Sequence, residues 1–189
     1  MLFCEHPYAY IPIMKQMHLK LLAAATAISF GWLRWQGASL FTAESKGGIV
    51  DLEMADSPEK LQHLLGLWNK QVAVNNIYID FLFIPCYAIF LAVGCQYMAE
   101  KVIRPSYQIW ANRLVKLLVV VALFDVVENI LMLMSIAGNF TSETLLLTRL
   151  IASCKFLLVG LAVLYILFGL FTSLVSKKST HPGTQPLED

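Results

Sequence analysis

The chain has 189 residues, of which 58% are hydrophobic and 14% charged, and its 14 Lys and Arg against 13 Asp and Glu give a formal net charge of +1. Soluble domains have about 25% charged residues, so this composition predicts an integral membrane protein and excludes a disordered chain. The near-zero net charge also excludes a nucleic-acid binder, which needs a clustered basic face.

Four windows of the sequence are long and apolar enough to cross a bilayer, which takes about 20 mostly apolar residues. They cover approximately residues 19–41, 77–99, 115–137 and 150–175, and the first is the weakest because it contains Arg34 and Gln36. The runs are continuously apolar and lack the alternation of barrel strands, so all four are predicted as helices. The predicted fold is all-α: a polytopic membrane four-helix bundle forming one domain over residues 19–176.

The segments outside these windows predict the topology. Residues 1–18 are expected to form a cytoplasmic leader and residues 177–189 a disordered cytoplasmic tail. The basic segment before residue 19 also resembles a signal peptide, but the apolar run continues to Phe41 without a convincing cleavage site, which favours a retained helix. Met1, Met14 and Met17 are all candidates for the first residue of the protein. Lys and Arg near the spans gather on the side of the two termini, which the positive-inside rule places in the cytoplasm, in what we expect to be a bacterial inner membrane.

The loop over residues 42–76 is predicted to lie on the outer side and to contain a short amphipathic helix at about residues 58–70. Ser57 and Pro58 provide an N-cap and a first-turn proline. Leu61, Leu64 and Trp68 then recur with helical spacing, which places apolar side chains on one face.

Five ionisable residues lie within the predicted spans: Arg34, Asp80, Asp125, Glu128 and Lys155. Each costs roughly 2.5 to 3.5 kcal/mol at a helix centre, so we expect them to be paired, with outward snorkelling of the side chain as the alternative for Arg34 beside Trp35. Their charges sum to −1, which a buried site would offset by keeping a proton, for which Glu128 is the preferred group, or by admitting a cation.

Spacing along the helices predicts that these residues share one polar pocket. Asp125, Glu128 and Asn129 stand at i, i+3 and i+4 and therefore on one face of the third span. Asp80 and Tyr87 share a face of the second span with Asn76, and Pro85 is expected to break that helix. The candidate binding residues are Arg34, Asp80, Tyr87, Asp125, Glu128, Asn129 and Lys155.

The sequence predicts no cofactor and no metal site. Its four cysteines have neither C-x-x-C nor metal-ligand spacing, and its four histidines fall outside the strongly apolar runs, so no pair of them can ligate a haem within the bundle. The expected partners are membrane lipids, a small-molecule or ion ligand, and a second copy of the chain in a homodimer.

Several motifs together resemble those of an uncharacterised group of bacterial four-helix integral membrane proteins, over about residues 20–175. They are D-F-x-F-x-x-x-Y from Asp80, D-x-x-E-N from Asp125, K-F from Lys155 and the loop string V-D-L-E-M-A from Val50. The resemblance implies that the acids, the lysine and the outer loop belong to one recurring arrangement, and it implies no activity.

Three functions are consistent with these observations. The first is a membrane protein that binds a small molecule, lipid or ion, with coupling to protons as an option. The second is a structural or assembly subunit whose ionic cluster only fixes helix packing. The third is a lipid-modifying enzyme with Asp125 and Glu128 as acid and base and Lys155 as their electrostatic partner. The enzyme is the least expected, because the sequence has no Ser/His/Asp set, H-E-x-x-H motif or Gly-rich phosphate loop.

Overall fold

The structure is a computed structural model that describes residues 10–102 and 104–178, and every regular element in these ranges is helical. The elements are α1 (Tyr10–Gln36), the 3-10 turn η2 (Ala38–Leu40), α2 (Ile49–Glu53), α3 (Pro58–Leu67), α4 (Lys70–Lys101), α5 (Pro105–Ile136) and α6 (Ser142–Lys178). The all-α prediction is confirmed. The described residues form six α-helices, of which four are long and two, α2 and α3, are short, and α2 was not expected.

Three of the helices in the described ranges are long and apolar enough to cross a membrane: Lys70–Lys101, Pro105–Ile136 and Ser142–Val175. They contain almost all of the last three predicted windows. The first window corresponds to α1, which is not among these three; α1 ends at Gln36 and is followed by η2. Much of the predicted leader and tail lies outside the described residues, and their described parts, 10–18 and 177–178, are helical.

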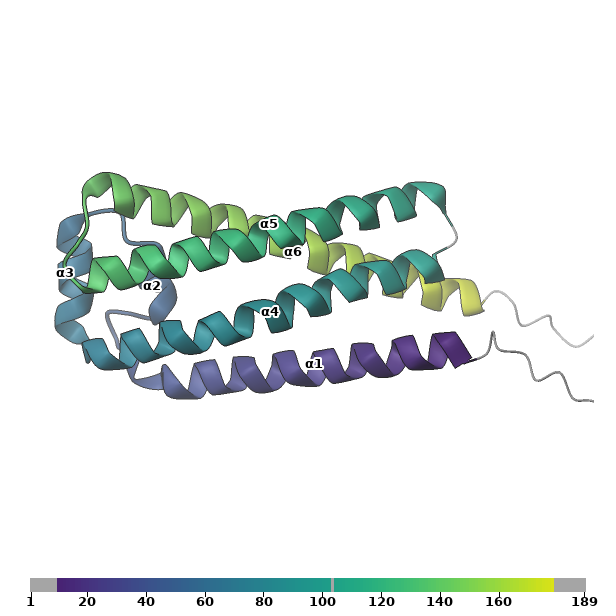
Figure 1. Cartoon of the computed structure of the whole chain (residues 1–189), viewed down its shortest axis with the longest axis horizontal. Helices are drawn as coiled ribbons and strands as arrows, with labels where there is room; N and C mark the ends of the chain where they lie inside the picture. The colour runs from purple at the N-terminus through teal and green to yellow at the C-terminus, as the bar shows by residue number, and fades with distance from the viewer. Residues whose placement is uncertain (1–9, 103, 179–189) are drawn as a thin grey trace, which may run out of the picture.

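The four long helices run side by side along the long axis of the molecule (Figure 1). The short helices α2 and α3 lie at the end opposite to the start of α1 and the end of α6. Helix α4 contacts α1, α5 and α6, whereas α1 packs mainly on α4. The Asn76 amide of α4 fastens α1 by donating to the Leu33 carbonyl and to Gln36 Oε1, both at 2.8 Å. Because α1 is held mainly by one helix, its other sides remain open.

Residues 38–69, which we call the cap, cover one end of the bundle. The predicted start of α3 is present, since Ser57 Oγ accepts a hydrogen bond from the Lys60 amide at 3.2 Å. The apolar side chains of the cap are buried against side chains of α4, α5 and α6. The shared core is Leu40, Leu52, Ala55, Leu61, Leu64, Trp68, Ala73, Ile77, Met132, Ile136 and Leu145. The cap is therefore a folded part of the bundle.

The half of the bundle away from the cap, which we call the termini-side half, is held by apolar packing of α4, α5 and α6. Its core is Ile84, Tyr87, Leu91, Cys95, Leu114, Leu118, Val121 and Ala162. Tyr107 and Tyr165 stack with ring centroids 4.1 Å apart, and each hydroxyl donates to the backbone carbonyl of the other residue.

One local expectation from the sequence is wrong. Pro85 does not break its helix, because α4 is continuous and the proline ring is exposed at its surface. Thr26 of α1 instead donates to the Cys86 carbonyl at 3.1 Å, so one backbone acceptor of this turn pairs with a neighbouring helix.

Candidate functional site

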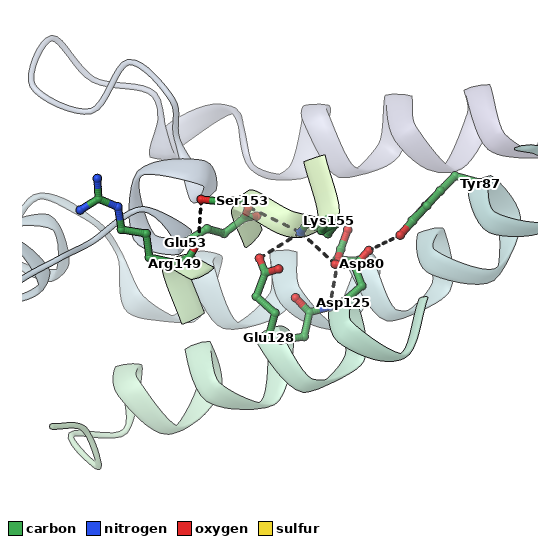
Figure 2. A network of polar contacts seen from close by, with 9 residues as sticks. Glu53, Asp80, Tyr87, Asp125, Glu128, Arg149, Ser153 and Lys155 are labelled. Atoms are coloured by element: carbon green, nitrogen blue, oxygen red, sulfur yellow. Dashed lines mark hydrogen bonds and ion pairs between the residues drawn. The ribbon is translucent and has the colours of Figure 1, made fainter. Parts of the chain in front are cut away.

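The site is centred on Lys155 of α6, whose ammonium group is almost fully enclosed, with 7% of the residue exposed. Its Nζ donates to Asp125 Oδ1 and to Glu128 Oε1 of α5, both at 2.9 Å. A third carboxylate, Glu53 Oε2 of α2, lies 3.6 Å away (Figure 2). One cation thus joins three acids from two other helices, which is the pairing that a charge in an apolar environment requires.

A second layer of hydrogen bonds orients these acids. Asp125 Oδ2 accepts from the Tyr87 hydroxyl of α4 at 2.6 Å, so both oxygens of this carboxylate are occupied. Asn129 Nδ2 donates to Asp80 Oδ2 at 2.8 Å, which links α5 to α4 a second time. The helical spacing of Asp125, Glu128 and Asn129 puts all three on one buried face of α5.

Glu53 belongs to this cluster although it was not among the predicted residues. It ends α2, and burial raises the pKa of its carboxyl group while the nearby Lys155 ammonium opposes that rise. The start of α2 is fixed by Asp51, whose Oδ2 accepts from Ser45 Oγ at 2.8 Å and from the Gly47 amide at 2.9 Å. The signal in the sequence was the string from Val50 to Ala55, in which acids alternate with apolar residues that could face a core.

Arg34 and Asn76 lie beside the cluster and do not pair with its acids. The Arg34 guanidinium is exposed and lies 4.1 Å from the centre of the Phe41 ring. The expected pairing of Arg34 with buried acids is therefore wrong, because its side chain turns toward an aromatic ring of the cap. With Glu53 added, four carboxyl groups, those of Glu53, Asp80, Asp125 and Glu128, surround a single ammonium. The predicted sum of −1 becomes −3 for the ionised cluster when Arg34 is left out.

Three buried oxygen atoms of the cluster have no hydrogen-bond partner among the described residues: Glu53 Oε2, Glu128 Oε2 and Asn129 Oδ1. All three are acceptors, and unmet acceptors in a dry interior cost free energy. The cluster therefore has more acceptors than donors, and a proton or a donor group would satisfy it.

A cavity of about 210 Å³ adjoins the cluster. It is lined by residues of α1, α2, α4, α5 and α6 together with η2 and the loop after it. Its polar lining residues include Glu53, Asp80, Asp125, Asn129 and Lys155, whereas Glu128 is fully buried and not part of the lining. Most of the other lining residues are apolar: Phe30, Leu33, Leu40, Phe41, Ile49, Val50, Ile77, Phe83, Met132, Phe156 and Val159. The space therefore has apolar walls and one acidic end.

The described residues contain no group of three or more His, Cys, Asp or Glu arranged to hold a metal ion. Comparisons with models of protein families, with curated proteins and with solved structures find no match for this chain. Fold and site together define its class: a helical bundle with three helices of membrane-spanning length and composition, in which a buried ionic cluster borders an apolar cavity.

Proposed function

We propose that this chain is an integral membrane protein that binds a small amphipathic molecule or a lipid in the cavity beside Lys155. The observation that carries the proposal is the pairing of apolar walls with unpartnered acceptors at one end of the same space. Ligand sites are usually apolar clefts with a few polar groups that orient the ligand. An amphipathic molecule matches both parts of this lining.

The distribution of exposed side chains supports a membrane location with α1 as a fourth span. On α1, large apolar side chains such as Leu21, Ile28 and Trp35 are exposed, as expected for a helix that faces lipid. In this arrangement the termini lie in the cytoplasm and the cap on the outer side, as the distribution of Lys and Arg predicts. The resemblance favours a bacterial inner membrane.

The route into the cavity is proposed to run between α1 and α6. Both helices line the cavity, but α1 packs mainly on α4 and leaves this side less covered. Phe30 of α1 and Phe156 of α6 line the space and are each about half exposed, at 50% and 44%. A molecule dissolved in the bilayer would reach the cavity sideways, past these two rings.

Coupling to protons is part of the proposal. Four carboxyl groups cannot all be ionised around one ammonium in a water-poor site, so the cluster holds protons. Burial raises the pKa of Glu53, which makes it one group that keeps its proton. A ligand that donates hydrogen bonds to the cluster would release part of this proton load.

The geometry gives less support to the two alternatives. An enzyme using Asp125 and Glu128 as base and acid needs both to reach a substrate, but Glu128 is 0% exposed and both oxygens of Asp125 are already hydrogen-bonded. A structural subunit would explain the ion pairs, which join α2, α5 and α6, but it would not explain a cavity that ends on unpartnered acceptors.

The test uses the full chain purified in nanodiscs and native mass spectrometry to detect a bound molecule. We expect an adduct in the wild type that is lost in Val159→Trp, because the indole fills the cavity from α6. Val163→Trp, one turn further along the same helix, is the matched control, since Val163 is exposed and does not line the cavity. An adduct that survives in Val159→Trp, or no adduct with any lipid mixture, would contradict the proposal.

A further inference from the structure

We infer that the ligand of this cavity carries a primary ammonium group on an apolar tail. The inference rests on the proposed function and names the chemical class of the molecule bound. It follows from the donors and acceptors at the acidic end, from the charge of the lining and from the size of the space.

The acidic end of the cavity is suited to a ligand that donates hydrogen bonds. Two of the residues that line the cavity, 7% and 1% exposed, have a buried oxygen without a hydrogen bond: Glu53 Oε2, which has only the 3.6 Å ion pair with Lys155, and Asn129 Oδ1. Asp80 also lines the cavity, and its one hydrogen bond in the described structure is the one from Asn129 at 2.8 Å. An ammonium group has three donors and no acceptor, which complements this set of oxygens.

The donors next to these oxygens are already occupied. The Lys155 ammonium is shared among three carboxylates, and the Tyr87 hydroxyl donates to Asp125. An anionic headgroup would find neither the Lys155 ammonium nor the Tyr87 hydroxyl free at this end and would meet three lining acids, Glu53, Asp80 and Asp125. Electrostatics and hydrogen bonding therefore select against an anion and for a cation.

The size of the space limits what enters it. A cavity of about 150 Å³ holds a benzene ring, so a cavity of about 210 Å³ accommodates a headgroup and a short stretch of chain. A longer tail would continue past Phe30 and Phe156 into the bilayer. The ligand class therefore includes free alkylamines and lipids with an amine headgroup.

Arg34, at the rim of the cavity, distinguishes a lipid with an amine headgroup from a free alkylamine. Arg34 lines the cavity, is exposed and makes no ion pair among the described residues. A phosphate next to the ammonium, as in phosphatidylethanolamine, would find a partner there. A free alkylamine would not use Arg34.

The test measures the thermal stability of the full chain in phosphatidylcholine nanodiscs with four probes that share an octyl tail: octylamine, octyltrimethylammonium, octanol and octanoate. We expect octylamine to bind at least about 10-fold more tightly than the other three, because octyltrimethylammonium has the charge without the N–H donors. At about 100 times its Kd it should raise the Tm by about 5 to 10 °C. Asp80→Asn should abolish most of this shift, whereas Asp56→Asn, on the exposed surface of the cap, should keep it. Comparing variants at one lipid concentration cancels the partitioning of the probes into the bilayer.

A second arm replaces part of the phosphatidylcholine by phosphatidylethanolamine. Stabilisation by this lipid that is lost in Arg34→Gln indicates the lipid as the source, and stabilisation by octylamine alone indicates a free amine; both support the inference. Equal Tm shifts with octylamine and octyltrimethylammonium, or a larger shift with octanol or octanoate, would overturn the inference that the ligand carries a primary ammonium group. They would leave the cavity as a ligand site. If native mass spectrometry also finds no bound molecule, the proposed function falls as well.

Discussion

The two halves of the helix bundle are packed in different ways. In the termini-side half, a Cβ added at Gly94 would lie 2.9 Å from Ile166 Cδ1, and one at Gly169 would lie 2.6 Å from the Tyr107 hydroxyl. In the half under the cap, the same three helices, α4, α5 and α6, border a cavity of about 210 Å³ and enclose Lys155 among acids. In the termini-side half the helices therefore associate closely without charged groups.

This difference indicates that the half under the cap is built around a polar group and an open space. Buried ion pairs add little net stability compared with apolar residues of the same size, although removing one partner is costly. A bundle selected only for stability would extend the apolar packing of the termini-side half to the cap. Substitutions confined to one half of the bundle separate these two kinds of packing.

The largest effect is expected for Lys155→Met. It removes the only cation among the described residues that is bonded to Asp125 and Glu128, and an uncompensated charge in a buried site costs about 3 to 5 kcal/mol. We expect a strong loss of folded protein in nanodiscs, measured as yield and as Tm.

Lys101→Met is the matched control, because Lys101 is exposed at the end of α4 and lies over the Tyr97 ring at 5.3 Å. Its effect should stay below about 1 kcal/mol. Adding Glu128→Gln to Lys155→Met should restore part of the lost stability, since it removes one unpaired charge. Equal stability of Lys155→Met and Lys101→Met would show that the cluster is not a paired buried site.

The next effect tests the packed half with Gly169→Ala. The new methyl group would lie within 3.0 Å of Met98 and the Tyr107 hydroxyl, and overpacking of this kind costs about 1 to 3 kcal/mol. Gly160→Ala on the same helix has no atom within 4 Å of its new Cβ, so it should be neutral or raise the Tm through helix propensity. If both variants had the same Tm, the termini-side half would not be packed closely.

The third prediction concerns pH and Glu53. Burial raises the pKa of this carboxyl group in the folded protein above its ordinary value near 4.5, against the opposing effect of Lys155. The charged groups around it are Lys155 of α6, Asp125 and Glu128 of α5, and Asp80 of α4. The folded state binds the proton more tightly than the unfolded state, so the stability from Glu53 is fully present below the ordinary value and is lost as pH rises through the folded one.

Glu53→Gln removes this titration while keeping the shape of the side chain. We expect the wild type to lose about 1 to 2 kcal/mol relative to Glu53→Gln between acid and alkaline pH, measured as the difference in Tm across a pH series. Glu59→Gln, an exposed position in the same cap, should follow the wild type at every pH. A constant difference between wild type and Glu53→Gln would mean that Glu53 does not titrate in the folded range.

The sequence predicted those parts of the site that depend on one helix at a time. The three long apolar helices follow from runs of apolar residues, and the buried face of α5 follows from the spacing of Asp125, Glu128 and Asn129. Glu53 was missed because the burial of a loop acid depends on how α2 docks against the bundle, which no local pattern encodes. The single-sided packing of α1 was missed for the same reason.

Arg34 gives the smallest expected effect and the sharpest contrast with Lys155, because both are cations within predicted spans. The Arg34 guanidinium is exposed and lies 4.1 Å from the centre of the Phe41 ring, a contact worth about 0.5 to 1 kcal/mol at an exposed site. In phosphatidylcholine nanodiscs, Arg34→Gln should therefore lower the stability by no more than about 1 kcal/mol, measured as Tm beside Lys155→Met. Arg34→Lys tests the stacking, since an ammonium lacks the planar face of the guanidinium and should lose most of this contact. If Arg34→Gln were as damaging as Lys155→Met, Arg34 would be a buried partner of the acids. It could then not be the residue at the rim of the cavity that binds a phosphate.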